Sequence, residues 1–191
     1  YSYGAPELSL ASAANTDISK WLNLLMFSTG GCSDSKILDE QAAAEQMMNL
    51  FYSYLSGANL VHDVGYINHG TNASLESLVL NEEMMSMVKQ FGKGINTDDE
   101  HLALDLIEEV GPGGEFVTSE HTFTHWQEWF LPTLQDRSDY ETWVNNGSKT
   151  MQERVKERTQ HLLDTHEPKP MDENLVKELR EIIHDADERH S

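Results

Sequence analysis

The sequence predicts an α/β protein in which two short parallel strands alternate with helices before the chain becomes helical throughout. Two apolar runs, 24–31 and 58–65, each end in glycine, as buried strands often do. Helical patterns at 6–22, 38–56 and 74–92 precede, separate and follow these runs. This order is that of βαβ units, so we expect parallel strands joined by right-handed crossovers.

Local signals predict where the helices of this first part begin and end. Asp39 can cap the N-terminus of the helix at 38–56, and Gly57 can end it. Ser74 is placed to cap the next helix, and Gly92 to stop it.

After Gly92 we expect only helices. Their patterns lie at 97–111, at 119–132 before Pro132, from about Lys149 within 140–166, and at 171–188 after the linker 167–170. We therefore divide the chain into residues 1–95, which hold the βα units, and a helical extension at 96–191 that packs on them.

Two parallel strands are too few for a stable sheet, because parallel sheets are covered by helices on both faces. The chain also starts at Tyr1 rather than Met. We therefore expect further strands in a segment before Tyr1. On this hypothesis residues 1–95 are the last two βα units of a (β/α)8 barrel.

The composition excludes several classes of protein. The net charge of −20 comes from 33 acidic and 13 basic residues, whereas nucleic acids and anionic membranes are bound by clustered Lys and Arg. The longest apolar runs, such as 24–27, are far shorter than the roughly 18 residues of a membrane span. We expect no nucleic-acid or membrane partner. The single cysteine cannot form an internal disulfide, so the sequence favours a cytoplasmic protein.

The best indication of a functional site is the polar sequence after each predicted strand, because parallel strands carry function at their carboxyl ends. Gly30 and Gly31 could let the backbone approach an anion, but a plain tight turn is the favoured interpretation, since no phosphate-loop motif surrounds them. Cys32 lacks the sequence signature of a catalytic thiol and is better interpreted as a small residue in a tight loop. The next three residues could bind a polar ligand or cap the following helix: Asp34, Ser35 and Lys36.

The second strand end brings His62 and Asp63 side by side in the sequence. This pair suits acid–base chemistry or a hydrogen bond to a ligand, although a histidine satisfied by its neighbours is an equal alternative. Tyr66 could offer its ring to a cationic ligand or belong to the core.

Two histidines, His121 and His125, are four residues apart and would share one helix face. This spacing can bind zinc, with Glu120 or Glu128 as a third ligand. The HExxH pattern is missing, however, so we predict no metal here.

Taken together, several segments resemble the C-terminal part of the trimethylamine methyltransferase family. They are "GAPE" (4–7), "GGCSDSK" (30–36) with "DEQAA" (39–43), "NLVHDVGY" (59–66), "SLESLVLNEEM" (74–84) and "LALDLIEEVGPGGEFVTSEHTFTH" (102–125). The resemblance spans nearly the whole chain, in order.

The resemblance implies the final portion of a (β/α)8 barrel that moves a methyl group from a methylated amine to the cob(I)alamin of a separate corrinoid protein. One branch of the family uses trimethylamine and contains pyrrolysine, and other members resemble glycine betaine methyltransferases. No pyrrolysine is written in this chain. It could lie upstream or be recorded as another residue at 28–36, so the substrate stays open between the branches. We also expect a homo-oligomer.

Within this expectation each candidate residue has a role. The catalytic residues would be Asp34, His62 and Asp63. The substrate would contact Gly30, Gly31, Ser35, Lys36 and Tyr66. His121 and His125 would face the corrinoid. Aromatic faces and carboxylates suit a cationic methyl donor.

Two other functions stay open. A metal-dependent barrel hydrolase could use His62, Asp63, His121 and His125. A non-enzymatic acidic helical module could bind a basic partner through the second half of the chain, which contains 23 acidic and 9 basic residues.

Overall fold

The computed structural model describes residues 2–190. The chain forms two compact units that divide between Thr159 and Gln160, and each is described by itself. The first unit holds every strand, so the predicted α/β class is confirmed for the described residues. The predicted division at residue 95 stays a prediction.

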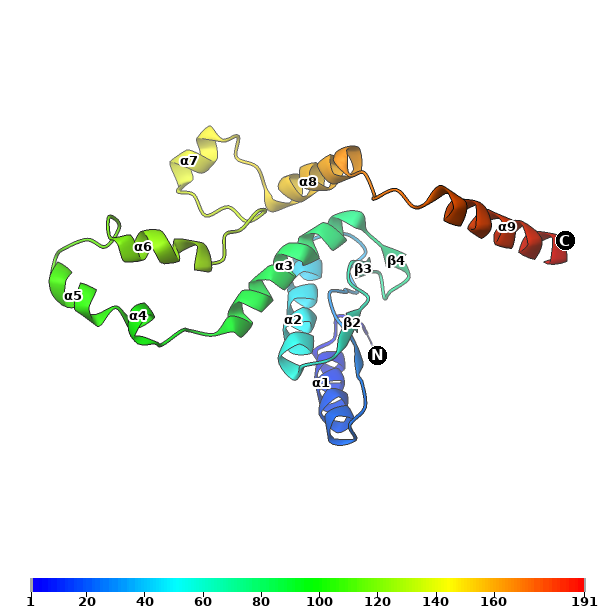
Figure 1. Cartoon of the computed structure of the whole chain (residues 1–191), viewed down its shortest axis with the longest axis horizontal. Coiled ribbons are helices and arrows are strands. Elements are labelled where there is room, and N and C mark those ends of the chain that lie inside the picture. Colours follow the sequence, from blue (N-terminus) through cyan, green and yellow to red (C-terminus); the bar gives the residue numbers. More distant parts are fainter. Residues whose placement is uncertain (1, 191) are drawn as a thin grey trace. The chain divides into compact units, whose positions relative to one another are not determined.

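Two parallel strands occupy the first unit, as predicted. β1 (Phe27–Thr29) pairs with β2 (Leu60–His62) in parallel, and Thr29 is the register partner of His62. Helix α2 (Glu40–Ser56) connects the strands, and α1 (Pro6–Trp21) packs against α2 (Figure 1). The strands are shorter than the apolar runs at 24–31 and 58–65, because only three residues of each run pair with the other strand.

A small hairpin follows β2 and was not predicted from the sequence. β3 (Tyr66–Ile67) and β4 (Asn72–Ala73) pair antiparallel, with Tyr66 opposite Ala73. The intervening Asn68, His69 and Gly70 all have positive φ. Such short strands leave no alternating apolar pattern, so the sequence reads as a loop.

The predicted helix caps are confirmed except at one end. Asp39 Oδ1 accepts a hydrogen bond from the Ala42 amide at 3.0 Å, and Gly57 ends α2 in the left-handed conformation with φ 71°. Ser74 caps α3 (Leu75–Lys93) through the Ser77 amide. The expected stop at Gly92 is wrong, because α3 continues to Lys93 and ends at Gly94, whose φ is 70°.

The apolar core lies between α2, α3 and the chain that returns after residue 133. Its buried members are Leu50, Leu80, Met84, Leu134 and Val155. Glu83 on α3 fixes the returning chain, because its carboxylate accepts hydrogen bonds from the Thr133, Leu134 and Gln135 amides at 2.9–3.1 Å. Val155 comes from α8 (Met151–Thr165), close to the predicted helix 149–166.

The segment between these anchors, residues 91–132, contains no fully buried residue, and beyond the last turn of α3 it has only short helices. The predicted helix at 97–111 is wrong, because Ala103, with φ 48°, separates α4 (Asp99–Leu102) from α5 (Leu104–Val110). The predicted helix at 119–132 is shorter than expected and consists of α6 (Glu120–His125) with the 3₁₀ turn η1 (Trp126–Glu128).

Two further helices complete the chain. α7 (Tyr140–Asn145) lies in the first unit and is capped by Asp139, which accepts a hydrogen bond from the Thr142 amide. α9 (Glu173–His190) lies in the second unit, close to the predicted 171–188. Among the described residues, no helix has both the length and the apolar character that crossing a membrane requires.

Candidate functional site

The two loops that follow β1 and β2 run side by side and are joined by their backbones. The Gly30 amide donates to the His62 carbonyl at 3.0 Å, and the Gly65 amide to the Gly31 carbonyl at 2.8 Å. Farther on, the Ser33 amide donates to the Tyr66 carbonyl at 3.0 Å. The polar residues predicted at the two strand ends are therefore brought together at one place in the fold.

Close packing accounts for both glycines in the first loop. A Cβ atom at Gly30 would lie 2.8 Å from Val61 Cγ1. Gly31 has φ 70°, and a Cβ atom there would lie 2.6 Å from Asn81 Oδ1. The tight-turn interpretation explains these contacts without a bound anion, while a substrate contact at either glycine stays a prediction.

Cys32, in the first loop, is fully buried, and its Sγ atom lies 3.7 Å from the Nδ2 atom of Asn49. Its burial, followed by the nearby charges of Asp63 and Asp34, raises the pKa of the thiol to about 12. A thiol in this environment stays protonated at neutral pH and is a poor nucleophile. These observations support the structural interpretation of Cys32.

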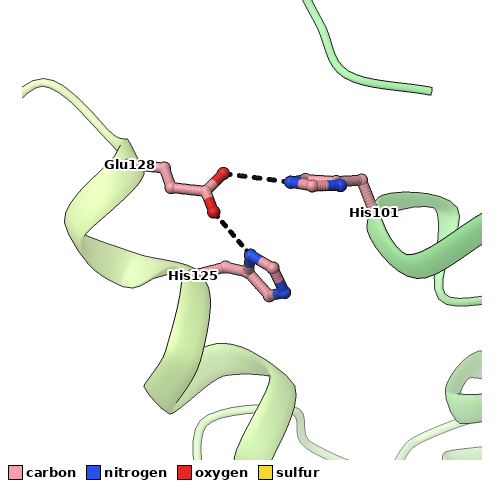
Figure 2. A group of neighbouring side chains, drawn as sticks. All are labelled: His101, His125 and Glu128. Carbon is pink, nitrogen blue, oxygen red and sulfur yellow. Dashed lines mark hydrogen bonds and ion pairs between the residues drawn. The ribbon is translucent and has the colours of Figure 1, made fainter. Parts of the chain in front are cut away.

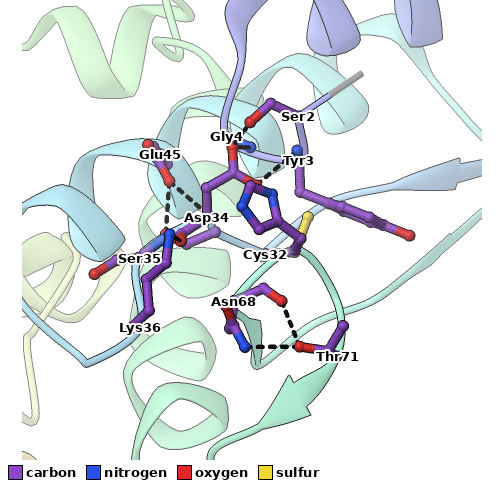
Figure 3. Close-up of polar contacts among 12 residues, drawn as sticks. Ser2, Tyr3, Gly4, Cys32, Asp34, Ser35, Lys36, Glu45, Asn68 and Thr71 are labelled. Atoms are coloured by element: carbon purple, nitrogen blue, oxygen red, sulfur yellow. Dashed lines mark hydrogen bonds and ion pairs between the residues drawn. The ribbon is translucent and has the colours of Figure 1, made fainter.

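Asp34 is a buried carboxylate that holds the N-terminal turn of the chain over the loops (Figure 3). It accepts hydrogen bonds from the Tyr3 amide at 2.9 Å, the Gly4 amide at 3.0 Å and the hydroxyl of Ser2. His69 Nδ1 lies 2.7 Å from Asp34 Oδ1. Because both oxygens are engaged, Asp34 acts first as an anchor.

Ser35 and Lys36 also make local contacts. The Ser35 amide donates to Ser33 Oγ at 2.9 Å, and the Ser35 side chain is buried. Lys36 is exposed and donates through Nζ to the Asp34 carbonyl at 2.8 Å. These contacts stabilise the loop, and binding of substrate by either residue stays a prediction.

His62 and Asp63 interact directly at the end of β2. His62 Nδ1 lies 2.7 Å from Asp63 Oδ1, and the imidazole stacks on Phe27 with ring centroids 4.4 Å apart. The other oxygen, Asp63 Oδ2, is buried and has no hydrogen-bond partner among residues 2–190. Asp63 has φ 68°, an uncommon conformation for a residue other than glycine. An unpaired buried carboxylate oxygen is costly unless a ligand or water completes it.

Two tyrosines lie near this carboxylate. The charge of Asp63 is the main cause that raises the pKa of the Tyr3 phenol, and burial, Cys32 and Tyr66 add to it. Tyr66 is 37% exposed, so it does not belong to the core. A carboxylate beside aromatic rings is an arrangement that can hold a cation.

The histidines of α6 belong to a second cluster. The rings of His121 and His125 have centroids 4.4 Å apart, and His101 of α4 joins them with its centroid 4.7 Å from that of His125. Within residues 2–190 no hydrogen bond, ion pair or ring contact connects this cluster to His62 or Asp63. The structure thus separates the four residues suggested for a metal-dependent hydrolase into two sets.

Several contributors to both clusters were not identified from the sequence. Tyr3 and His69 lie in segments without a chemical motif, and only the fold brings them to Asp34 and Asp63. Glu45, which accepts hydrogen bonds from Ser33 Oγ and the Asp34 amide, has the sequence context of an ordinary helix residue. His101 lies 24 positions before His125, so no local spacing indicates their contact.

Comparison with known proteins identifies the family. The family model described as trimethylamine methyltransferase (MTTB) matches residues 1–190. The chain belongs to the trimethylamine methyltransferase family. This confirms the resemblance that the sequence motifs indicated.

Curated members of the trimethylamine methyltransferase family are similar to almost the whole chain. A glycine betaine methyltransferase of Desulfitobacterium hafniense strain Y51 is 36% identical over 184 residues, which cover 95% of this chain and 38% of that protein. The trimethylamine methyltransferase MttB of Desulfitobacterium hafniense strain DCB-2 is 33% identical over 98% of this chain and 38% of its own length. The MttB of Methanosarcina barkeri strain Fusaro is 34% identical over 96% of this chain and 37% of its own length. The chain therefore spans less than two fifths of the length of these relatives.

Proposed function

We propose that this chain is the C-terminal part of a (β/α)8 enzyme that transfers a methyl group from a methylated amine to the cob(I)alamin of a separate corrinoid protein. Family membership supports methyl transfer from methylated amines, because the relatives are named for trimethylamine and glycine betaine. The observation that carries the proposal to particular residues is the unpaired oxygen of Asp63, buried near two tyrosines at the strand ends.

The exposed faces of the strands support the barrel. Phe27 on β1 is 59% exposed and Leu60 on β2 is 63% exposed. Parallel strands are normally covered on both faces and paired on both edges. Further strands of a closed barrel would cover these side chains, and the greater length of the relatives provides room for them.

The site suits a cationic methyl donor. Asp63 would place its free oxygen against the positive charge of the amine, while Tyr3 and Tyr66 would offer aromatic faces. Asp34 would act by positioning, since its hydrogen bonds hold the turn that carries Tyr3. The loops would orient the reacting methyl group and exclude water.

The corrinoid of the partner protein supplies the nucleophile, so no side chain of this chain has to attack the methyl group. This agrees with the protonated, buried thiol of Cys32. A quaternary amine leaves as a neutral tertiary amine and needs no proton. Trimethylamine must instead be protonated on its nitrogen, so that breaking the N–CH3 bond releases neutral dimethylamine rather than a dimethylamide anion. His62, hydrogen-bonded to Asp63 through Nδ1, is the proton donor that we assign.

The partner corrinoid protein would dock near α6. Two large apolar side chains around the predicted corrinoid-facing His121 and His125 are strongly exposed: Phe123 is 78% exposed and Trp129 is 72% exposed. Exposed aromatic residues of this kind are enriched at protein interfaces.

A variant series tests the assignment of Asp63. The complete gene product is mixed with its corrinoid protein in the cob(I)alamin state, and trimethylamine or glycine betaine is added. Asp63→Asn should lower the rate of methyl transfer by about 100-fold, because charge stabilisation is lost while shape is kept. Asp17→Asn, on the exposed face of α1, is the matched control and should keep the full rate. An unchanged rate in Asp63→Asn would contradict the assignment.

A further inference from the structure

Three side chains from three short helical elements converge in the segment 91–132. His101 comes from α4, His125 ends α6, and Glu128 lies in η1 (Figure 2). Each residue offers one possible ligand atom, and these three atoms all lie within 4.8 Å of one another. Two imidazoles and one carboxylate form a common protein ligand set for Zn²⁺.

The two histidines direct particular nitrogens at the glutamate. His101 Nε2 lies 3.1 Å from Glu128 Oε2, and His125 Nδ1 lies 2.6 Å from Glu128 Oε1. Zinc bonds of about 2.0–2.1 Å in a tetrahedral shell put ligand atoms about 3.3 Å apart. Small side-chain rotations would therefore bring these three atoms around one ion.

The remaining nitrogens of both imidazoles are held by other carboxylates. His101 Nδ1 lies 2.6 Å from Asp98 Oδ1, and His125 Nε2 lies 3.4 Å from Glu100 Oε1. A carboxylate on the far nitrogen orients a metal-bound histidine and makes it a better ligand. An outer partner for each imidazole is what distinguishes this cluster from histidines that form a single ion pair on a surface.

The cluster also borders a space in which a fourth ligand fits. A pocket of about 690 Å³ is lined by His101, His121, His125 and Glu128, with Trp129 and Lys93 among its other walls. Both ligand histidines are mostly covered, with side chains 20% and 14% exposed. Three protein ligands beside an open space correspond to a zinc site that keeps one position for water or a small ligand.

The segment around the cluster has little else to fix its conformation. None of its residues from 91 to 132 is fully buried, and its helices are at most seven residues long. Metal ligation can replace a hydrophobic core in such a segment, because binding free energy then contributes to folding.

We propose that His101, His125 and Glu128 bind one divalent transition-metal ion, with Zn²⁺ as the ion tested, and that Asp98 and Glu100 orient the two histidines. The HxxxH spacing of His121 and His125 is by itself a weak metal signal, so no metal is predicted there from the sequence. His101, supplied by another helix, provides the missing ligand. The proposal is independent of methyl transfer.

The test uses the complete gene product, stripped with a chelator and then titrated with Zn²⁺ against a chromophoric zinc indicator. We expect binding that depends on this site. His101→Ala and Glu128→Gln should each weaken the zinc affinity of the site at least 100-fold. Asp98→Asn, which removes only an orienting partner, should weaken it about 10–100-fold. His184→Ala is the matched control, because His184 also pairs with a glutamate, 3.3 Å away, and should leave affinity unchanged.

Two further readouts separate a built site from a general loss of structure. Co²⁺ at the site should give the visible absorption of a low-coordinate ion, and this absorption should disappear in His125→Ala while circular dichroism stays native. Zn²⁺ should also slow hydrogen exchange in residues 98–129 of the unmodified protein. Absence of stoichiometric zinc in the unmodified protein, or equal affinity in all variants, would overturn the proposal.

Discussion

Two regions of the first unit differ in what holds them together. The packed region, residues 2–90 and 133–159, contains every buried residue of the unit, and many of these are polar. The histidine segment, residues 91–132, contains none. Each region nevertheless has a cluster of chemically capable side chains, one around Asp63 and the other around His101.

This difference shows what holds the side chains of each cluster in position. In the packed region, loops tied by backbone hydrogen bonds and packed against Asn49 and Asn81 fix Asp34 and Asp63 before any ligand arrives. In the histidine segment, none of residues 91–132 is fully buried, and the cluster is restrained by short helices and by side-chain contacts such as Gln90 Nε2 to the Glu128 carbonyl at 2.8 Å. We therefore expect the first site to be preorganised and the second to depend on what it binds.

The largest expected contrast concerns the reactivity of Cys32. Alkylation requires the thiolate, and a pKa of about 12 leaves almost none at pH 8. The peptide that contains Cys32, followed by mass spectrometry, should react with iodoacetamide about 1,000-fold more slowly in the folded protein than in denaturant. Equal rates would show that the loops at the strand ends open freely.

The next effect tests the junction between the two regions. Glu83 is buried and accepts hydrogen bonds from three backbone amides and from Thr133 Oγ1 at 2.7 Å. Glu83→Ala leaves these donors unpaired, so the free energy of unfolding should fall by about 3 kcal/mol. Urea denaturation measures this loss. Glu82→Ala, at the neighbouring exposed position on α3, is the matched control and should change stability by less than about 0.5 kcal/mol.

A pH series tests the same junction with a smaller effect. Burial opposes ionisation of Glu83, but hydrogen bonds from Gln135, Leu134 and Thr133 outweigh it and lower the pKa of its carboxyl. The pKa of Glu83 in the folded protein is thus below its value of about 4.3 in the unfolded chain. The stabilisation that ionised Glu83 provides is therefore complete above about pH 4.3, and it is lost as the pH falls through the pKa of the folded protein. The stability difference between the unmodified protein and Glu83→Gln should shrink on acidification below about pH 4. A difference that is constant from pH 7 to pH 3 would contradict this account.

The smallest effect is expected in the histidine segment without metal. His121 is half-buried and contacts the Glu100 carbonyl through Nε2 at 2.9 Å. His121→Ala should change the free energy of unfolding by no more than about 0.5 kcal/mol in the presence of a chelator. A loss above about 2 kcal/mol would mean that this segment has a core of its own.

The sequence predicts the packed region better than the histidine segment for a physical reason. Asp39, Gly57 and Ser74 carry local signals whose partners lie within a few residues, and the glycine-ended apolar runs indicate a parallel pair. Ala103 adopts a left-handed conformation, which glycine usually occupies. Because no glycine marks this position, the break between α4 and α5 was not predicted.

The candidate sites follow the same rule. Polar site residues were predicted after both strands, because parallel strands carry function at their carboxyl ends, and the two loops lie together in the structure. The free oxygen of Asp63 and the approach of Tyr3 depend on distant packing that no spacing reveals. His101 joins His125 only through the fold of residues 91–132, and the helical patterns at 97–111 and 119–132 do not indicate that the two histidines meet.

Methyl transfer itself tests the central claim most directly. The complete gene product, its corrinoid protein in the cob(I)alamin state and a methylated amine are combined, and absorbance is followed with trimethylamine and with glycine betaine in separate reactions. We predict conversion to methylcob(III)alamin with one of the two amines. Absence of conversion with every methylated amine tried, with the corrinoid protein shown to be reduced and intact, would contradict the account.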